Sequence, residues 1–382
     1  MLEVWHVGAP PSPNAVDGVG MVVWQVAREQ ANLGHAVTLI LDAEPDESAR
    51  TLAAEANIRL IHLTSRFLRY DGARLRRLLR ESRPDIVHFH KTFIPEHFPL
   101  TRTLISSEIP YVLTPHGGVN HRKRNLKKTA YTWLVERGRF RRAAAITTVA
   151  PLEERAIRKL VTDYKREITW IPNPVDVRLL DGHEWSGDLY STPKKMMFLG
   201  RFHVVNKGID TLVQVSHRLL GEVEAHLYGT DHPQTGKLLA RLKADLPRNV
   251  HFHGPVSGEE KARLLAGSDL YIQTSRWEGF SISIAEAMYV GVPCVVTDTP
   301  HPDQIVHHAE VMKDLGLGLV LPVGSEQAAK VLLENLSEPS RLLQFAARAR
   351  SFARENFTPR AAALGYLEVY GKAMSEVPAS SR

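Results

Sequence analysis

The segment from Trp277 to Pro293, WEGFSISIAEAMYVGVP, carries two carboxylates, Glu278 and Glu286, around a predicted helix start. The first turn of a helix offers unpaired backbone N–H groups and partial positive charge, which suit a phosphate. An ionised glutamate only accepts hydrogen bonds and therefore suits hydroxyl groups. If the helix begins near Phe280, Glu286 lies about 9 Å along it, at about 1.5 Å per residue. The segment could therefore hold a diphosphate with a polyhydroxyl group on each side, which is the shape of a nucleotide-sugar.

A second segment, GRFHVVNKGID from Gly200 to Asp210, follows an apolar strand-like run and opens a predicted helix. Arg201 and Lys207 in this segment could neutralise a diphosphate, the first as a planar fork and the second as a mobile point charge. A transfer reaction needs most stabilisation where charge develops on the departing diphosphate. An ordinary exposed basic loop is the alternative interpretation, and the glutamate pair makes it less favoured.

Taken together, the two segments resemble the retaining glycosyltransferases of family four, which have the GT-B fold. That family carries a Gly-Arg…Lys-Gly loop and two glutamates separated by seven residues in its second domain, and this chain has both. The resemblance implies that Arg201 and Lys207 bind the diphosphate, Glu286 the ribose hydroxyls and Glu278 the transferred sugar. Further donor contacts are expected at Gly18, Gly20, Val256, Gly279, Phe280 and Ser281. Ser281 replaces a glycine of the family pattern, and its hydroxyl could cap the helix or touch phosphate.

The resemblance extends more loosely into the first half of the chain. Gly18 and Gly20 precede a predicted helix and match the glycine-rich loop of the family. A dinucleotide site would need a further glycine where Val23 stands. His116 follows a strand-like run, and family members often place a histidine there, near the donor sugar. It could bind a hydroxyl or assist the reaction, whereas a purely structural histidine is the alternative.

Strand-like and helix-like segments alternate along nearly the whole chain, which predicts βαβ units and parallel sheets. A polar stretch, 177–193, is predicted as a linker between a Rossmann-like acceptor domain, 1–176, and a Rossmann-like donor domain, 194–355. Residues 356–382 are predicted as a C-terminal helix and tail that could pack back on the first domain. The expected architecture is therefore α/β, of the GT-B type, with a cleft between two Rossmann-like domains.

Basic residues are concentrated in the stretches 66–83 and 121–142, and the net charge is +6. In the second stretch, Leu126, Trp133 and Phe140 recur at roughly helical spacing. A basic amphipathic helix can lie on an anionic membrane surface or reach an anionic acceptor. A solvated helix packed on its own domain is the alternative. No nucleic-acid-binding motif accompanies the charge, so no nucleic-acid partner is expected.

The remaining features restrict the cellular setting and the chemistry. A single cysteine, Cys294, excludes an intramolecular disulfide and fits a cytoplasmic protein. We expect no secretory signal and no membrane span, hence a cytoplasmic location, either free or peripheral on the inner face of the membrane. The pairs His88/His90 and His251/His253 would each share a strand face. The sequence shows no further ligands beside them, so neither a metal nor another cofactor is expected.

The sequence therefore predicts a metal-independent glycosyltransferase that moves a hexose, with UDP-hexose as the best guess. The acceptor is expected to be a saccharide or lipid-linked, in polysaccharide or glycolipid biosynthesis. In the family that this chain resembles, retention is usually explained by front-face displacement. Two alternatives stay open at this point: a non-hydrolysing sugar-nucleotide epimerase of the same architecture, and a basic membrane-surface binding protein.

Overall fold

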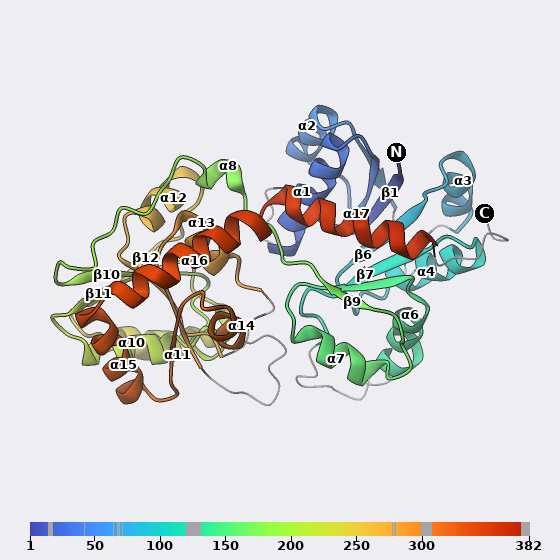
Figure 1. The fold of residues 1–382 in the computed structure, drawn as a ribbon. Helices are drawn as coiled ribbons and strands as arrows, with labels where there is room; N and C mark the ends of the chain where they lie inside the picture. Colours follow the sequence, from blue (N-terminus) through green and yellow to red (C-terminus); the bar gives the residue numbers. More distant parts are fainter. Residues whose placement is uncertain are drawn as a thin grey trace. The chain divides into compact units, whose positions relative to one another are not determined.

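The computed structural model describes residues 1–13, 18–41, 43–63, 65–66, 69–70, 72–119, 131–276, 278, 280–298 and 308–375. The chain divides into two compact units. The first unit comprises Met1–Pro174 and Pro359–Arg382, and the second comprises Val175–Thr358. Each unit contains one parallel sheet with helices around it, so the prediction of two Rossmann-like α/β domains is confirmed (Figure 1).

The sheet of the first unit has the order β3-β2-β1-β6-β7-β8-β9, and all of its pairings are parallel. Its strands are β1 (Glu3–Ala9), β2 (Ala36–Leu41), β3 (Ile58–His62), β6 (Ile86–His90), β7 (Tyr111–Thr114), β8 (Ala145–Thr148) and β9 (Ile168–Trp170). A short antiparallel pair is formed by β4 (Ser65–Arg66) and β5 (Arg69–Tyr70). The helices of this unit are α1 (Gly18–Asn32), α2 (Glu47–Glu55), α3 (Gly72–Glu81), α4 (His97–Ser106), η1 (Thr132–Glu136), α6 (Arg137–Arg142), α7 (Glu153–Leu160) and α17 (Pro359–Ser375).

The sheet of the second unit has the order β12-β11-β10-β13-β14-β15 and is also parallel throughout. Its strands are β10 (Lys194–Leu199), β11 (Val223–Tyr228), β12 (Val250–His253), β13 (Leu270–Gln273), β14 (Cys294–Thr297) and β15 (Leu319–Leu321). Its helices are α8 (Val177–Leu180), α9 (Val204–Lys207), α10 (Ile209–Arg218), η2 (Pro233–Thr235), α11 (Gly236–Ala244), α12 (Gly258–Ala266), α13 (Ile282–Val290), α14 (His308–Leu315), α15 (Ser325–Ser337) and α16 (Ser340–Asn356). The strand order reverses between β10 and β13, and this is the point where open α/β sheets bind their ligands.

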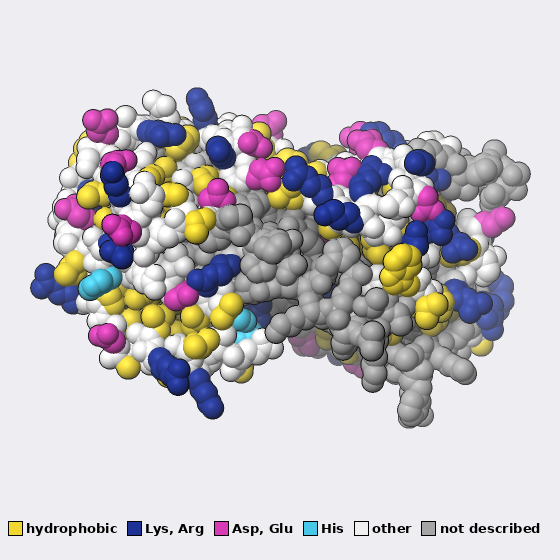
Figure 2. Space-filling model, turned by 90° about the horizontal axis from the view of Figure 1, so that it is seen from below, with side chains coloured by type: hydrophobic (Ala, Val, Ile, Leu, Met, Phe, Trp, Pro, Cys, Tyr) yellow, Lys and Arg dark blue, Asp and Glu magenta, His cyan; other side chains and the backbone are white. Residues whose placement is uncertain are grey.

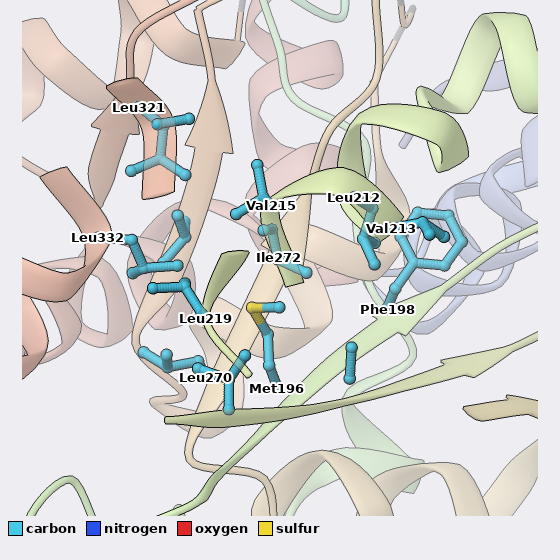
Figure 3. Packing of buried hydrophobic residues seen from close by; sticks show 14 of the residues in the cluster. Met196, Phe198, Leu212, Val213, Val215, Leu219, Leu270, Ile272, Leu321 and Leu332 are labelled. Carbon is cyan, nitrogen blue, oxygen red and sulfur yellow. The ribbon is translucent and has the colours of Figure 1, made fainter. Parts of the chain in front are cut away.

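Strand β10 is buried between two layers of helices, which explains its nearly continuous apolar sequence. Met196 and Phe198 point into a core that includes residues of α10 and α15, such as Val213 and Leu332 (Figure 3). Met197 points to the opposite face and packs with residues of α12 and α13. The alternation of side chains along a strand therefore places one hydrophobic core on each side of the sheet.

The borders of the compact units differ from the domain limits expected from the sequence. The polar stretch 177–193 lies within the second unit, contains α8, and is fixed there by a hydrogen bond that Trp185 Nε1 donates to Ser268 O (2.8 Å). Helix α17 belongs to the first unit, where it packs along α1 (Figure 1). Within the described residues, no helix combines the length and the apolar character that a membrane span requires.

Candidate functional site

The carboxyl ends of β10 and β13 bring two predicted site segments together in the second unit. The segment after β10 forms α9 and then turns at Gly208, whose φ is +62°. A Cβ atom on Gly208 would lie 2.1 Å from the carbonyl oxygen of Thr274, so only glycine fits. The hydroxyl of Thr274 donates to the carbonyl oxygens of Lys207 (2.9 Å) and Gly208 (3.0 Å). These contacts fix Lys207 beside the segment that follows β13.

Lys207 and Glu278 form a direct ion pair. The same carboxylate oxygen, Glu278 Oε1, accepts hydrogen bonds from Ser275 Oγ (2.9 Å) and Gln273 Nε2 (3.3 Å). The side chains of Lys207 and Glu278 are only 15% and 13% exposed, so water screens the pair weakly. Gln273 and Ser275 therefore orient Glu278, and the sequence-based prediction missed both residues. The only sequence feature that could have identified them is their position at the end of a strand-like segment, which forms β13.

Glu286 lies in the middle of α13 and pairs with a second lysine. Lys261 Nζ on α12 is 2.5 Å from Glu286 Oε1, and the two side chains are 19% and 7% exposed. Lys261 was not predicted as a site residue, because it belongs to the preceding helix. Two largely buried lysine–glutamate pairs thus lie around the N-terminal half of α13. A diphosphate could compete for both ammonium groups and leave the carboxylates to accept hydrogen bonds from hydroxyl groups.

The other residues expected to contact the donor in this unit lie close to α12 and α13. Ser281 is the residue before α13, but its hydroxyl donates to Gln273 Oε1 (3.3 Å) and makes no capping hydrogen bond, so the expected cap is wrong. The ring of Phe280 packs edge-on against Phe357, with 5.5 Å between centroids. Val256 lies between β12 and α12 and packs on the same core. Gly279 lies outside the described residues.

Arg201 lies after β10, separated from it by Gly200, and is exposed. Burial, and to a lesser degree the positive charges of neighbours that include Arg201, lowers the pKa of His203 at the start of α9. A second arginine, Arg276, forms a two-pronged ion pair with Asp210, at 2.9 and 2.8 Å, and its backbone N–H donates to Asn206 O (2.8 Å). Arg276 therefore joins the loops that follow β10 and β13.

In the first unit, a line of histidines holds His116. His116 Nε2 is 3.0 Å from His90 Nδ1, and His90 Nε2 is 2.9 Å from His6 Nδ1. The second nitrogen of His6 is 2.8 Å from the amide oxygen of Gln30. Because this oxygen can only accept, each of the three rings donates from Nε2. Burial lowers the pKa of His6 to about 4, and burial with the neighbouring imidazoles holds that of His90 well below its usual range.

The residues that flank His116 show how its loop is fixed. His116 itself has a φ of +51°, a conformation that is uncommon for a residue with a side chain. The next residue, Gly117, donates its backbone N–H to Glu153 Oε1 (2.6 Å), and Val149 N–H donates to Glu153 Oε2 (3.3 Å). Burial raises the pKa of Glu153 to about 7, although both hydrogen bonds act in the opposite direction. The uncharged histidines and this carboxyl group therefore hold His116 in one orientation.

Gly18 and Gly20 lie inside the first turn of α1 rather than in a loop before it. Their backbone N–H groups belong to the helix N-terminus, a favourable position for an anion. The residues immediately before them, 14–17, lie outside the described residues.

Part of the second basic stretch is described, from Tyr131 onward, and it forms η1 and α6. Glu136 and Arg139 are buried and paired with each other, at 2.9 Å, so neither contributes charge to the surface. Trp133 and Leu134 are 60% and 81% exposed, and the guanidinium of Arg137 lies over the Trp133 ring at 4.6 Å. On the face shown in Figure 2, basic side chains are interspersed with acidic ones rather than gathered in a single patch.

Two family models match the chain. "Glycosyl transferases group 1" matches residues 193–338, and "Glycosyltransferase Family 4" matches residues 16–179. The MMP alpha-(1->4)-mannosyltransferase of Mycolicibacterium hassiacum is 27% identical over 71% of this chain and 67% of that protein. The GDP-mannose:cellobiosyl-diphosphopolyprenol alpha-mannosyltransferase of Xanthomonas oryzae is 28% identical over 56% of each chain.

Solved structures show the same fold. The structure of Anabaena HepE in complex with UDP and glucose has a TM-score of 0.72 and 16% sequence identity, and the match covers 97% of this chain and all of that one.

Neither the epimerase nor the surface-binding alternative gains support from these matches, since the matching families and relatives are glycosyltransferases. The chain is therefore a glycosyltransferase with the GT-B fold, and its two halves are similar to the family models of glycosyltransferase family 4 and glycosyl transferases group 1.

Proposed function

We propose that this protein is a retaining glycosyltransferase that transfers a hexose from a nucleoside diphosphate sugar, best guess UDP-hexose, to a saccharide or lipid-linked acceptor. The product would belong to a polysaccharide or glycolipid. The observation that carries the proposal is the pairing of Lys207 with Glu278 and of Lys261 with Glu286 around the N-terminal half of α13.

Donor binding would exchange these ion pairs for contacts with the ligand. The diphosphate takes Lys207 and the exposed Arg201 as partners, because its charge density exceeds that of a single carboxylate. Glu278 then accepts hydrogen bonds from the transferred sugar, still oriented by Gln273, and Glu286 accepts them from the ribose. In this weakly screened environment the fixed charges stabilise the charge that develops on the leaving group.

The proposed transfer step needs no side chain to accept the proton of the acceptor. The bond between sugar C1 and the diphosphate oxygen breaks, and the acceptor oxygen forms its bond to C1 on the same face. The proton of the acceptor hydroxyl passes to the departing phosphate. The protein then supplies positioning and charge stabilisation. On the family resemblance, Gly18 and Gly20 contact the donor or acceptor, and His116 contacts a sugar hydroxyl.

The base of the donor is proposed to be uracil. HepE was solved with UDP and glucose, whereas the Xanthomonas oryzae relative is named for GDP-mannose. We place the base near Val256, in the segment between β12 and α12. A thermal-shift panel of UDP-, GDP- and ADP-sugars, followed by donor hydrolysis in the absence of acceptor, decides the base. No stabilisation by any of these donors would refute the assignment.

Site variants test the roles of the paired residues. Removing one transition-state contact of this type costs on the order of 10²–10³ in kcat. We expect this loss for Glu278→Gln and Lys207→Ala, and we expect Lys261→Ala to act mainly on the donor KM. Lys330→Ala removes an exposed lysine of α15 in the same unit and is the matched control. Transfer by Glu278→Gln or Lys207→Ala at the rate of the unchanged protein would contradict the proposal.

We also propose that the first unit contacts the inner face of a membrane from the cytoplasm through η1 and α6. The support is the exposure of Trp133 and Leu134 with Arg137 over the Trp133 ring, since aromatic, apolar and basic groups together favour an anionic interface. Sedimentation with anionic vesicles is expected for the unchanged protein and reduced for Trp133→Ser with Leu134→Ser. Equal binding to zwitterionic vesicles, or no loss in the double variant, would contradict this contact.

A further inference from the structure

Histidines of β11 and β12 meet on one face of the sheet in the second unit. The two strands are parallel and pair His226 with His251. Glu224 precedes His226 by two residues, and His253 follows His251 by two, so all four side chains lie on the same face. The sequence showed only the pair on β12. The neighbouring strand supplies the further ligands that the pair lacks.

Three of these side chains are close enough together to bind one metal ion, and the fourth, His253, contacts one of the three. A carboxylate oxygen of Glu224 and one ring nitrogen each of His226 and His251 all lie within 4.8 Å of one another. His226 Nε2 is 3.8 Å from Glu224 Oε2, whereas His226 Nδ1 is 3.1 Å from His253 Nε2. A histidine that binds a metal through one nitrogen commonly donates the other N–H to a nearby acceptor, which fixes its tautomer and ring orientation. His253 is placed to be that acceptor.

We propose that Glu224, His226 and His251 bind a divalent transition-metal ion of the zinc class, and that His253 positions His226. Two imidazoles and a carboxylate are a donor set that Zn²⁺ uses, with a water molecule in the fourth position. A pocket of about 330 Å³ adjoins His226 and is lined by Lys195, Tyr228 and Arg263 among others, which leaves room for that water.

The charges around this centre favour a cation. Glu224 provides the negative charge, and Lys195 on the adjacent strand opposes it. The ring of Tyr228 stacks on His253 at 4.5 Å and restrains it.

A second group of histidines in the chain, His6, His88 and His90, has comparable spacing but a different character. The ring nitrogens of His6 and His90 are engaged with each other, with Gln30 and with His116. Those of His88 lie 2.6 Å from Tyr370 OH and from Thr114 Oγ1. We therefore interpret His6, His88 and His90 as a buried hydrogen-bonded cluster rather than as a metal site. In contrast, no hydrogen bond involving the His251 ring exists among the described residues, so His251 can take a ligand without breaking a bond.

A metal at Glu224, His226 and His251 would tie the edge strand β12 to β11, and it is separate from the transfer chemistry. A ligand that binds only the folded protein stabilises it by mass action. The proposal therefore expects Zn²⁺ to raise the thermal transition of the protein, while chelation leaves transfer activity in place. Loss of transfer on chelation would count against metal-independent transfer, not against this site.

The test uses the full chain without a histidine tag, stripped of metal and titrated with Zn²⁺ by calorimetry and with Co²⁺ by visible absorption. We expect one ion per chain and the intense visible bands of a low-coordinate cobalt centre. His251→Ala should abolish saturable binding, and His253→Phe, which keeps the stack on Tyr228, should weaken it about 10–100-fold. His217→Ala removes an exposed histidine of α10 and is the matched control.

Two results would overturn the proposal. One is Zn²⁺ binding by His251→Ala with the affinity of the unchanged protein. The other is a loss of affinity in His217→Ala as large as that in His251→Ala, since binding would then be spread over surface histidines.

Discussion

The buried carboxyl group of Glu153 makes the stability of the first unit depend on pH. Its side chain is inaccessible to solvent and holds the backbone N–H groups of Gly117 and Val149, next to His116. The informative change is Glu153→Gln, which keeps the size of the side chain and removes the proton equilibrium. Glutamine can accept only one of the two hydrogen bonds well, so the pH dependence of the stability difference is the useful quantity.

The magnitude follows from the pKa of Glu153. Burial raises it from an ordinary value of 4.5 to about 7 in the folded protein. Between these two values the folded state binds more protons than the unfolded state, so stability falls as pH rises. At about 1.4 kcal/mol for each unit between the two pKa values, the whole effect is about 3 kcal/mol. About 2.5 kcal/mol of it falls between about pH 5 and pH 8.

The assay is urea unfolding of the unchanged protein and Glu153→Gln at these two pH values, followed by tryptophan fluorescence. The variant should gain about 2.5 kcal/mol relative to the unchanged protein on going from the lower to the higher pH. Buried histidines titrate in both proteins, so their contribution cancels in the difference. Glu154→Gln, a 43% exposed carboxylate of the same helix, is the control and should leave the pH dependence unchanged. Parallel stability curves for Glu153→Gln and the unchanged protein would refute the reasoning.

Two further stability predictions concern the second and first units. Gly208→Ala combines a positive φ with a Cβ that would lie 2.1 Å from Thr274 O, so we expect a loss of about 2–4 kcal/mol in urea unfolding. Gly221→Ala has a φ of +93° but open space around the Cβ, so it should cost clearly less; equal losses would contradict the role of the close approach. Tyr370→Phe removes the hydroxyl that lies 2.6 Å from His88 Nδ1 in a buried environment, and should cost about 1–3 kcal/mol. Tyr190→Phe, at a 75% exposed side chain, is its control, and a Tyr370→Phe protein as stable as this control would show that the hydrogen bond is unimportant.

Much of the fold could be predicted from the sequence, because buried parallel strands appear as short apolar runs. Strand β14, Cys294–Thr297, is such a run, and all four of its residues are buried. Helix α2 has a weaker sequence signal, since the residues it buries are Ala49 and Ala53, which give a weak apolar pattern. Its start is marked by Asp46, whose side chain accepts from Ala49 N–H.

Part of the candidate site could also be predicted from the sequence, whereas its contacts could not. By itself, the sequence determined which chemical groups are available: two glutamates at a helix start, and an arginine and a lysine in the loop that opens another helix. It did not determine their partners. Lys207 and Glu278 are 71 residues apart, and Lys261 and Glu286 are 25 apart. Lys261 in particular carried no signal.

Only the tertiary structure decided these partners, because they depend on strand order rather than on spacing along the chain. The reversal between β10 and β13 places the ends of these strands side by side and so joins Lys207 to Glu278. The register of β11 with β12 likewise sets His226 beside His251, where the sequence shows two separate histidines. Parallel pairing brings together residues that long crossover connections separate, so local sequence pattern cannot reveal these contacts.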